Sequence, residues 1–318
     1  MKKTFQKTLI AASVGVVMLS AAGTASANSL LFPYFTTMAG AQSVLTLTNT
    51  NTAAAATANA LHYVYNYGTS CKHFDDSGSM TNNDTMSHSI ASPTTASGFG
   101  KVVSTDTSTP VYFPEAGTTG FLVVSSKGTG VAAAQQGNGK DLTGSMAIVD
   151  TSSGLVVSYA PIDNGLDTYI ANGNEGNFAT EDDLKFALSF MPKGYVTTSW
   201  FGVVTGNMYS AITAGANWGG VVTFTNNGNV YNNDERPYSG TTTKAITCSG
   251  SITPTSLMES AQETAVGANG GLIKVTGTPT VGASGAVLMK MQTVLPAVGA
   301  PFAGKQFMHR EAATPTAW

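Results

Sequence analysis

The segment Leu45–Asn49 alternates apolar and hydroxyl-bearing side chains, and this pattern constrains the fold more than any other feature of the chain. Its two leucines would face one side of a strand and its two threonines the other, which is the period-two pattern of a half-buried β-strand. The same pattern returns 177 positions later in Val222–Asn226. The chain is therefore expected to be built from β-sheet.

Further landmarks recur in the same order along the chain. They are Cys71 and Cys248 at the same spacing of 177, Gly78–Thr81 and Gly250–Thr253 at 172, and Gly117–Gly120 and Gly282–Gly285 at 165. Small changes in loop length would produce such a drift in spacing. The pattern favours an internal duplication, although threonine-rich strands and glycine-serine turns also resemble one another through composition alone.

Short strands separated by frequent turn residues favour sandwiches over a parallel sheet with crossover helices. The sequence therefore predicts an all-β fold with two similar β-sandwich modules, Ig-like or jelly-roll-like, and a small mixed insert. The expected boundaries are a signal peptide at 1–27, a first module at 28–130, the insert at 131–198, a second module at 199–294, and a Pro/Ala/Gly-rich C-terminal tail without strands at 295–318.

Four local patterns refine this prediction. Pro33 makes residues 30–35 an edge strand or a lead-in, because proline cannot donate to a central ladder. In the insert, residues 146–149 and 155–157 predict a hairpin, and Thr180 with three following acidic residues predicts a helix over 184–191. Residues 257–265 predict a second short helix, and residues 68–98 predict turns.

The first 27 residues have the three parts of a secretory signal peptide in order. Three lysines are followed by an apolar run from Leu9 to Leu19 and then by the small residues Ala25-Ser26-Ala27, which predicts cleavage before Asn28. We therefore expect an exported protein, extracellular or on the cell surface, with the periplasm as the less favoured location.

Charged residues make up 10% of the chain, against roughly 25% in ordinary soluble domains. Hydrophobic residues at 42% and aromatic residues at 9% argue against disorder. The formal net charge of −3, which becomes −6 without the three lysines of the signal peptide, disfavours nucleic acid as a partner. An uncharged surface does not repel copies of itself, so self-association is expected, with a soluble monomer as the alternative.

The only two cysteines, Cys71 and Cys248, fit one disulfide in an exported chain. Their matched places in the two repeats suggest a bond with each other. A bond between subunits, or two free thiols, stays open from the sequence.

Residues 75–80 resemble the Asp-x-Ser-x-Ser metal motif of von Willebrand factor A domains, through Asp75, Ser77 and Ser79. One carboxylate and two hydroxyls would suit Mg²⁺, which prefers oxygen ligands. The resemblance covers six residues and lacks the apolar strand before the motif and the amphipathic helix after it. A plain Asp/Gly turn is the main prediction here, and a metal site is the alternative.

Three histidines lie close together in the sequence near Cys71 and Met80. Imidazole, thiolate and thioether ligands would suit copper or zinc, so His62, His73 and His88 are weak candidates for a metal site. The Asn- and Asp-rich loops at 163–167 and 226–234 could hold Ca²⁺, but Asn-Gly pairs are more often simple turns. No other cofactor is predicted.

No nucleophile elbow or phosphate-binding loop is present in the sequence, and we expect a protein that is not an enzyme. The leading hypothesis is an exported structural protein of the bacterial cell surface or extracellular matrix. Its partners would be copies of itself, in a layer, filament or matrix, and components of the cell envelope.

Two alternatives stay open: an adhesin that binds glycans, and a periplasmic metal-binding protein. For the adhesin, the available aromatic residues are Tyr63, Tyr65, Tyr67, Trp200, Trp218 and Tyr238.

Overall fold

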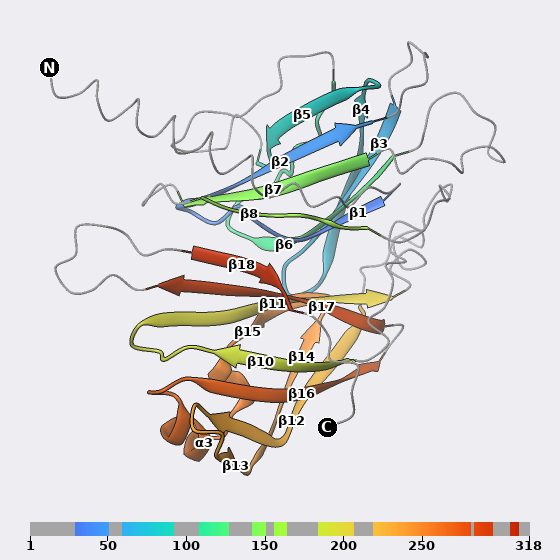
Figure 1. The fold of residues 1–318 in the computed structure, drawn as a ribbon. Coiled ribbons are helices and arrows are strands. Elements are labelled where there is room, and N and C mark those ends of the chain that lie inside the picture. The colour runs from blue at the N-terminus through green and yellow to red at the C-terminus, as the bar shows by residue number, and fades with distance from the viewer. Residues whose placement is uncertain are drawn as a thin grey trace, which may run out of the picture. The chain divides into compact units, whose positions relative to one another are not determined.

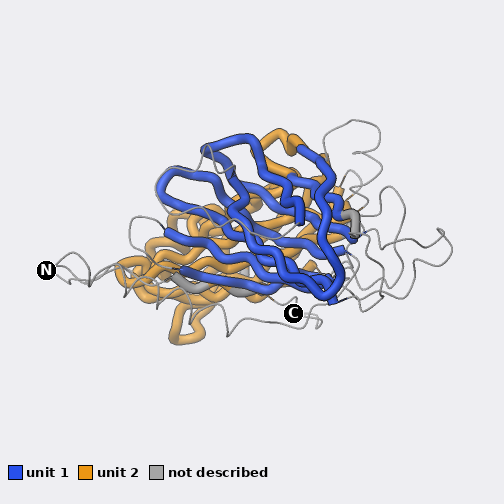
Figure 2. The backbone as a smooth tube through the Cα atoms, turned by 90° about the horizontal axis from the view of Figure 1, so that it is seen from above, with its two compact units in different colours: residues 1–65, 74–175 blue, residues 66–73, 176–318 orange. Residues whose placement is uncertain are grey.

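A computed structural model shows a nearly all-β chain, as predicted (Figure 1). It describes residues 29–50, 59–91, 108–126, 142–150, 156–163, 184–206, 219–280, 283–294 and 306–311. The chain divides into two compact units, which Figure 2 shows in different colours. Unit 1 comprises residues 1–65 and 74–175, and unit 2 comprises residues 66–73 and 176–318.

Unit 1 contains two sheets in its described residues. The first has the strand order β4-β3-β6-β1-β9 and the second the order β5-β2-β7-β8. Their strands are β1 (Ser29–Thr36), β2 (Ala41–Asn49), β3 (Asn59–Tyr67), β4 (Lys72–Met80), β5 (Asp84–Ser89), β6 (Thr119–Ser126), β7 (Leu142–Asp150), β8 (Val156–Tyr159) and β9 (Ile162–Asp163).

Unit 2 also contains two sheets. One has the order β10-β16-β12-β13, with β14 also paired to β12, and the other the order β15-β11-β17-β18. Their strands are β10 (Lys185–Phe190), β11 (Val196–Gly206), β12 (Val221–Asn232), β13 (Pro237–Tyr238), β14 (Thr241–Thr247), β15 (Ser249–Ile252), β16 (Gly271–Thr280), β17 (Ala283–Val294) and β18 (Gln306–Arg310).

The strand β2 confirms the alternation from which the fold was predicted. Leu45 and Leu47 are buried, while the threonines between and beyond them are partly exposed. These threonines pair with hydroxyl groups of β5: the Thr46 and Ser87 hydroxyls are 2.9 Å apart. Cross-strand pairs of this kind stabilise a sheet on its outer face. On this face of β2, hydroxyl-bearing side chains occupy positions where charged side chains are usual.

The prediction that residues 30–35 form an edge strand is contradicted at Leu30 and Leu31, which pair with β9, while no pairing of Pro33 with β9 is present in the described residues. Strand β1 lies between β6 and β9, and all eight of its residues are buried. Its register against β6 shifts between Phe32 and Phe35, so the proline lies within an irregularity of the pairing. A β-bulge accommodates a residue that cannot donate a hydrogen bond, and this allows proline inside the sheet.

Three other local predictions are also wrong. Residues 185–190, expected in a helix, form β10, which pairs with β16 along its whole length. The expected turns within 68–98 contain β4 and β5. The tail expected without strands contains β18, which is antiparallel to β17. The partner of β10 lies far away in sequence, so tertiary pairing overrode the local cap signal there. By contrast, β4 and β18 each pair with the strand that precedes them, β3 and β17, and their polar or proline-rich composition concealed these strands.

The predicted hairpin of the insert and the second short helix are confirmed. β7 and β8 pair antiparallel, and the 3₁₀ turn η1 (Pro254–Leu257) leads into α3 (Ser260–Val266). The described strands of 131–198 belong to the sheets of the two units, since β7 pairs with β2 and β10 with β16. The predicted signal peptide and residues 164–167 of the loop predicted to hold Ca²⁺ lie outside the described residues.

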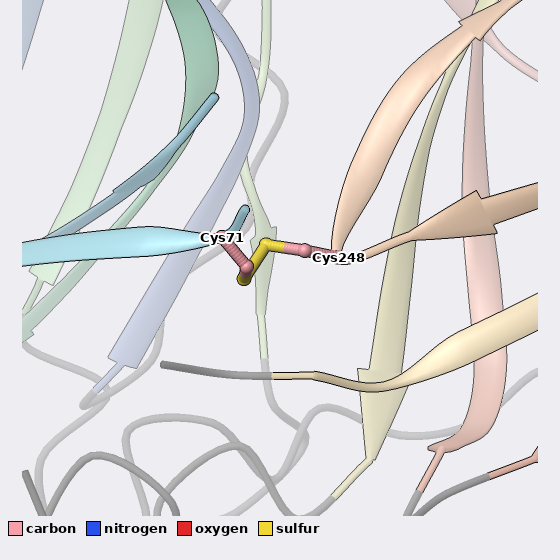
Figure 3. Close-up of a disulfide and its surroundings, with 2 residues drawn as sticks. All are labelled: Cys71 and Cys248. Atoms are coloured by element: carbon pink, nitrogen blue, oxygen red, sulfur yellow. A yellow bond between two sulfur atoms is a disulfide. The ribbon is translucent and has the colours of Figure 1, made fainter. Parts of the chain in front are cut away.

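Cys71 and Cys248 form a disulfide, with their Cα atoms 5.5 Å apart (Figure 3). Both residues belong to unit 2, because residues 66–73, at the turn between β3 and β4, group with that unit. Both have left-handed backbone conformations, with φ of 52° and 64°. The bond within one chain that the sequence favoured is thus confirmed, and it joins positions 177 residues apart.

Candidate functional site

The residues of the predicted magnesium motif lie on an extended strand and not in a turn. Asp75, Ser77 and Ser79 occupy alternate positions of β4, so they share one face of the strand. Alternate residues of a strand are about 7 Å apart, whereas Mg²⁺ holds its ligands at about 2.1 Å. The three side chains therefore do not converge on one point.

The histidines of the sequence-predicted metal cluster are dispersed as well. His62 Nε2 lies 3.4 Å from Asp75 Oδ2 on the neighbouring strand, and His88 is fully buried on β5. Cys71, which was considered beside them, is in the disulfide. Within the described ranges, no group of three or more His, Cys, Asp or Glu residues is arranged to hold a metal ion.

His88 lies among aromatic rings in unit 1. Its ring centroid is 6.0 Å from that of Tyr63 and 5.6 Å from that of Tyr112. Burial lowers the pKa of His88 to about 4, because an apolar environment disfavours the charged imidazolium. Its Nδ1 lies 3.0 Å from the carbonyl oxygen of Ser89, to which it donates in the neutral tautomer. His88 is therefore a neutral core residue at physiological pH.

Tyr63 and Tyr65 are buried beside this histidine, and desolvation raises the pKa of both phenols. Tyr67 and Trp200 are also buried. Of the other aromatic residues considered for glycan binding, Tyr238 is half-buried and Trp218 lies outside the described residues. These buried side chains cannot stack on a sugar, so they provide no glycan platform.

A cavity with a volume of about 190 Å³ lies in unit 2, next to α3. The end of β10, the start of β11 and the η1 segment build its walls. Its apolar lining consists of Phe190, Met191, Val196, Pro254 and Met258. An apolar wall of this kind favours hydrocarbon or aromatic groups.

Hydroxyl groups and one ion pair supply the polar part of this pocket. The hydroxyl-bearing lining residues are Thr197, Thr198, Thr253 and Thr255. At the rim, Lys193 Nζ lies 3.3 Å from Glu263 Oε1. Because this pair is exposed to solvent, it adds little to stability, but it leaves the rim without net charge.

A network of buried amide groups holds η1 and α3 in place beside the sheet. Asn226 Nδ2 donates to the Leu257 carbonyl oxygen at 2.9 Å. Gln262 Nε2 donates to the Tyr238 carbonyl oxygen at 2.9 Å, and Gln262 Oε1 accepts from the Glu259 backbone N–H at 2.9 Å. Since both amide side chains are buried, their hydrogen bonds fix the helix end that forms one wall of the pocket.

The turn on the opposite wall is equally well defined. The backbone N–H groups of Tyr195 and Val196 both donate to the Pro192 carbonyl oxygen at 3.0 Å, and the Lys193 N–H donates to the Gly267 carbonyl oxygen at 3.3 Å. Gly270 has φ of +77°, and a Cβ atom there would lie 2.8 Å from the Phe190 carbonyl oxygen. Only glycine fits this close approach, so the pocket has a rigid frame.

Sequence reasoning did not predict this pocket. Its lining comes from residues 190–198 and 253–267, two parts of the chain that are more than fifty residues apart, and it contains no known motif. The one available signal was Tyr195 and Met191 on either side of Pro192-Lys193-Gly194, two large apolar residues in a turn where small polar residues are usual.

No family model, curated protein or solved structure matches this chain significantly. Among the described residues, no helix has the length and apolar character to cross a membrane.

Proposed function

We propose that this protein is an exported, non-enzymatic structural component of the bacterial cell surface or extracellular matrix that assembles with copies of itself. One observation carries the proposal: three sheet edges are almost uncharged. The edge strands β8, β14 and β15 contain a single charged side chain between them, Lys244. Charged residues normally protect such edges against pairing with another chain.

The strand β14 illustrates how these edges could associate. It pairs with β12 over residues 241–247, and no other described strand pairs with it. Three threonines and Ala245 are exposed at alternate positions along it. An edge of seven residues that is rich in threonine and has Lys244 as its one charged side chain offers backbone N–H and C=O groups to a further strand. Cell-envelope components are additional candidate partners.

The finer architecture belongs to the same proposal: each unit is a β-sandwich, and the two units are copies of one strand arrangement. Without the two-residue strands β9 and β13, the order β4-β3-β6-β1 corresponds to β14-β12-β16-β10. The order β5-β2-β7-β8 likewise corresponds to β15-β11-β17-β18. Taken in chain order, the eight strands of each unit are thus distributed between its two sheets in the same way. This supports a duplication.

The test of assembly is sedimentation velocity of residues 28–318 over a hundredfold range of protein concentration. We expect the sedimentation coefficient to rise with concentration. Since few charges are involved, the rise should change little between low and high salt. A monomer at every concentration would contradict the proposal. Fractionation of the source cells, followed by immunodetection, would test the expected surface location.

A further inference from the structure

We propose that the pocket beside α3 receives Tyr195 of a second copy of this chain, in a two-fold contact where each copy fills the pocket of the other. This inference rests on the proposed self-association and names one of its contacts. It starts from the β10–β11 turn, residues 191–195. Tyr195 is 73% exposed and Met191 is 50% exposed.

Large exposed apolar side chains are concentrated at this place. Among the described residues, only Met38, on unit 1, is exposed to a similar degree, at 47%. Met191 lines the pocket, and Tyr195 is the direct neighbour of the lining residue Val196. A protruding aromatic residue and an apolar hollow therefore lie on one patch, and tyrosine is among the residues that contribute most to binding when buried at an interface.

The size and chemistry of the pocket fit a phenol ring. An apolar protein cavity of about 150 Å³ accommodates benzene, and this pocket has about 190 Å³. Phe190, Val196 and Met258 would contact the ring faces. The hydroxyl groups of Thr253 and Thr255 offer hydrogen-bond partners to the phenol oxygen, which a buried tyrosine requires.

The patch is complementary to itself. In a two-fold contact the same surface occurs on both partners, so a residue that protrudes must find its hollow on that same surface. The charges at the rim are also complementary to themselves, because Lys193 and Glu263 have opposite signs and lie 3.3 Å apart. A second copy turned by 180° can therefore place its lysine near the glutamate of the first, without opposing like charges.

Such a contact closes after two copies, because both hollows are then filled. A layer or filament would need a second kind of contact, for which the uncharged edges β8, β14 and β15 are available. The pocket contact would thus form the dimer from which larger assemblies grow.

The test uses two single variants in residues 28–318, each removing one side of the contact. Tyr195→Ala removes the protruding ring, and Thr255→Trp places an indole at the pocket mouth. Both positions are exposed, so the urea unfolding midpoint should stay near the wild-type value. Each variant should raise the dimer dissociation constant, measured by sedimentation, at least tenfold. Met38→Ala, the matched control, should change it less than twofold.

Mixing the two variants gives the sharper result. The intact tyrosine of Thr255→Trp can enter the open pocket of Tyr195→Ala, so the mixture should form a heterodimer more tightly than either variant forms a homodimer. In wild-type protein, p-cresol, which has the shape of the tyrosine side chain, should compete with dimer formation.

Each other result has a distinct meaning. Wild-type assembly that Tyr195→Ala leaves unchanged would overturn the pocket contact and leave the proposed function standing. If both variants form weaker dimers and their mixture forms no heterodimer, the pocket contact is also overturned. Unchanged sedimentation of Tyr195→Ala, with loss of binding on a glycan array, would assign the turn to a sugar instead. A wild-type monomer at all concentrations would remove both proposals.

Discussion

At the scale of single residues, His88 couples folding stability to pH. Its pKa in the folded protein is lowered to about 4 by burial, against about 6.5 in an unfolded chain. Between these values the unfolded state binds a proton that the folded state does not. The free energy of unfolding therefore falls as pH falls from 6.5 to 4, and this contribution is fully present only above pH 6.5.

A variant without the imidazole tests this coupling. Between pH 7 and pH 4.5, wild-type protein should lose roughly 2 to 3 kcal/mol more unfolding free energy than His88→Leu, as measured by urea unfolding. Ser87→Ala, on the same strand and without a titrating group, should keep the wild-type pH dependence. Identical pH profiles for wild type and His88→Leu would show that folding does not change the pKa of His88.

Individual residues also show where sequence reasoning succeeds and where it does not. The disulfide between Cys71 and Cys248 could be predicted, because a chain with a predicted signal peptide and two cysteines has few alternatives. The irregular pairing at Pro33 could not, since a proline gives no local sign that a bulge will accommodate it. The burial of Tyr63 and Tyr65 likewise depends on partners far along the chain, such as Phe113 and His88.

At the scale of elements, β10 shows how two local signals compete. Thr180 and the acidic residues after it predicted a helix, yet Phe186, Leu188 and Phe190 are buried at alternate positions. This period of two was present in the sequence and indicates a strand. The cap residues led to the prediction of a helix, because they are a local signal. The pairing of β10 with β16, about ninety residues later, could not be read from the local sequence.

The C-terminal strand β18 depends on a buried ion pair at its end. Lys290 Nζ, on β17, lies 3.5 Å from Glu311 Oε1 and 2.7 Å from Ser189 Oγ. The Trp200 indole N–H donates to the same carboxylate oxygen at 3.0 Å. Lys290 thereby connects the end of β18 with β10 in the other sheet of unit 2, so we expect it to hold the last strand in place.

Removing one member of this ion pair should lower the unfolding free energy more than removing both. Lys290→Met leaves the carboxylate of Glu311 partly buried without its cation, and the unfolding free energy should fall by about 3 kcal/mol. Adding Glu311→Gln removes the charge and keeps an acceptor for Trp200, so the double variant should regain most of that loss. Urea unfolding of wild type, both single variants and the double variant gives the coupling energy. A double variant as unstable as Lys290→Met would refute the ion pair as the cause.

At the scale of the whole molecule, the sequence indicated sheets, but the two strands that it matched are not the pair that the proposed duplication aligns. It matched Leu45–Asn49 with Val222–Asn226, which belong to β2 and β12. Under the proposed duplication, the strand orders align β2 with β11, and β3 with β12. Threonine-rich strands resemble one another through composition, so a short pattern can match the wrong strand. Strand order depends on long-range pairing, which no local pattern contains.

The disulfide is the feature that acts on the whole molecule, because it closes a loop across 177 positions. Cross-links that close long loops restrict the unfolded chain most, and a loop of this length should contribute roughly 3 to 5 kcal/mol. The double variant Cys71→Ala/Cys248→Ala should therefore unfold at a clearly lower urea concentration, measured where the protein is monomeric. Wild-type protein unfolded in dithiothreitol should match the variant, since both cysteines are then reduced. Because both are fully buried, reduction of folded wild-type protein should be slow, and fast reduction under native conditions would contradict the buried position of the bond.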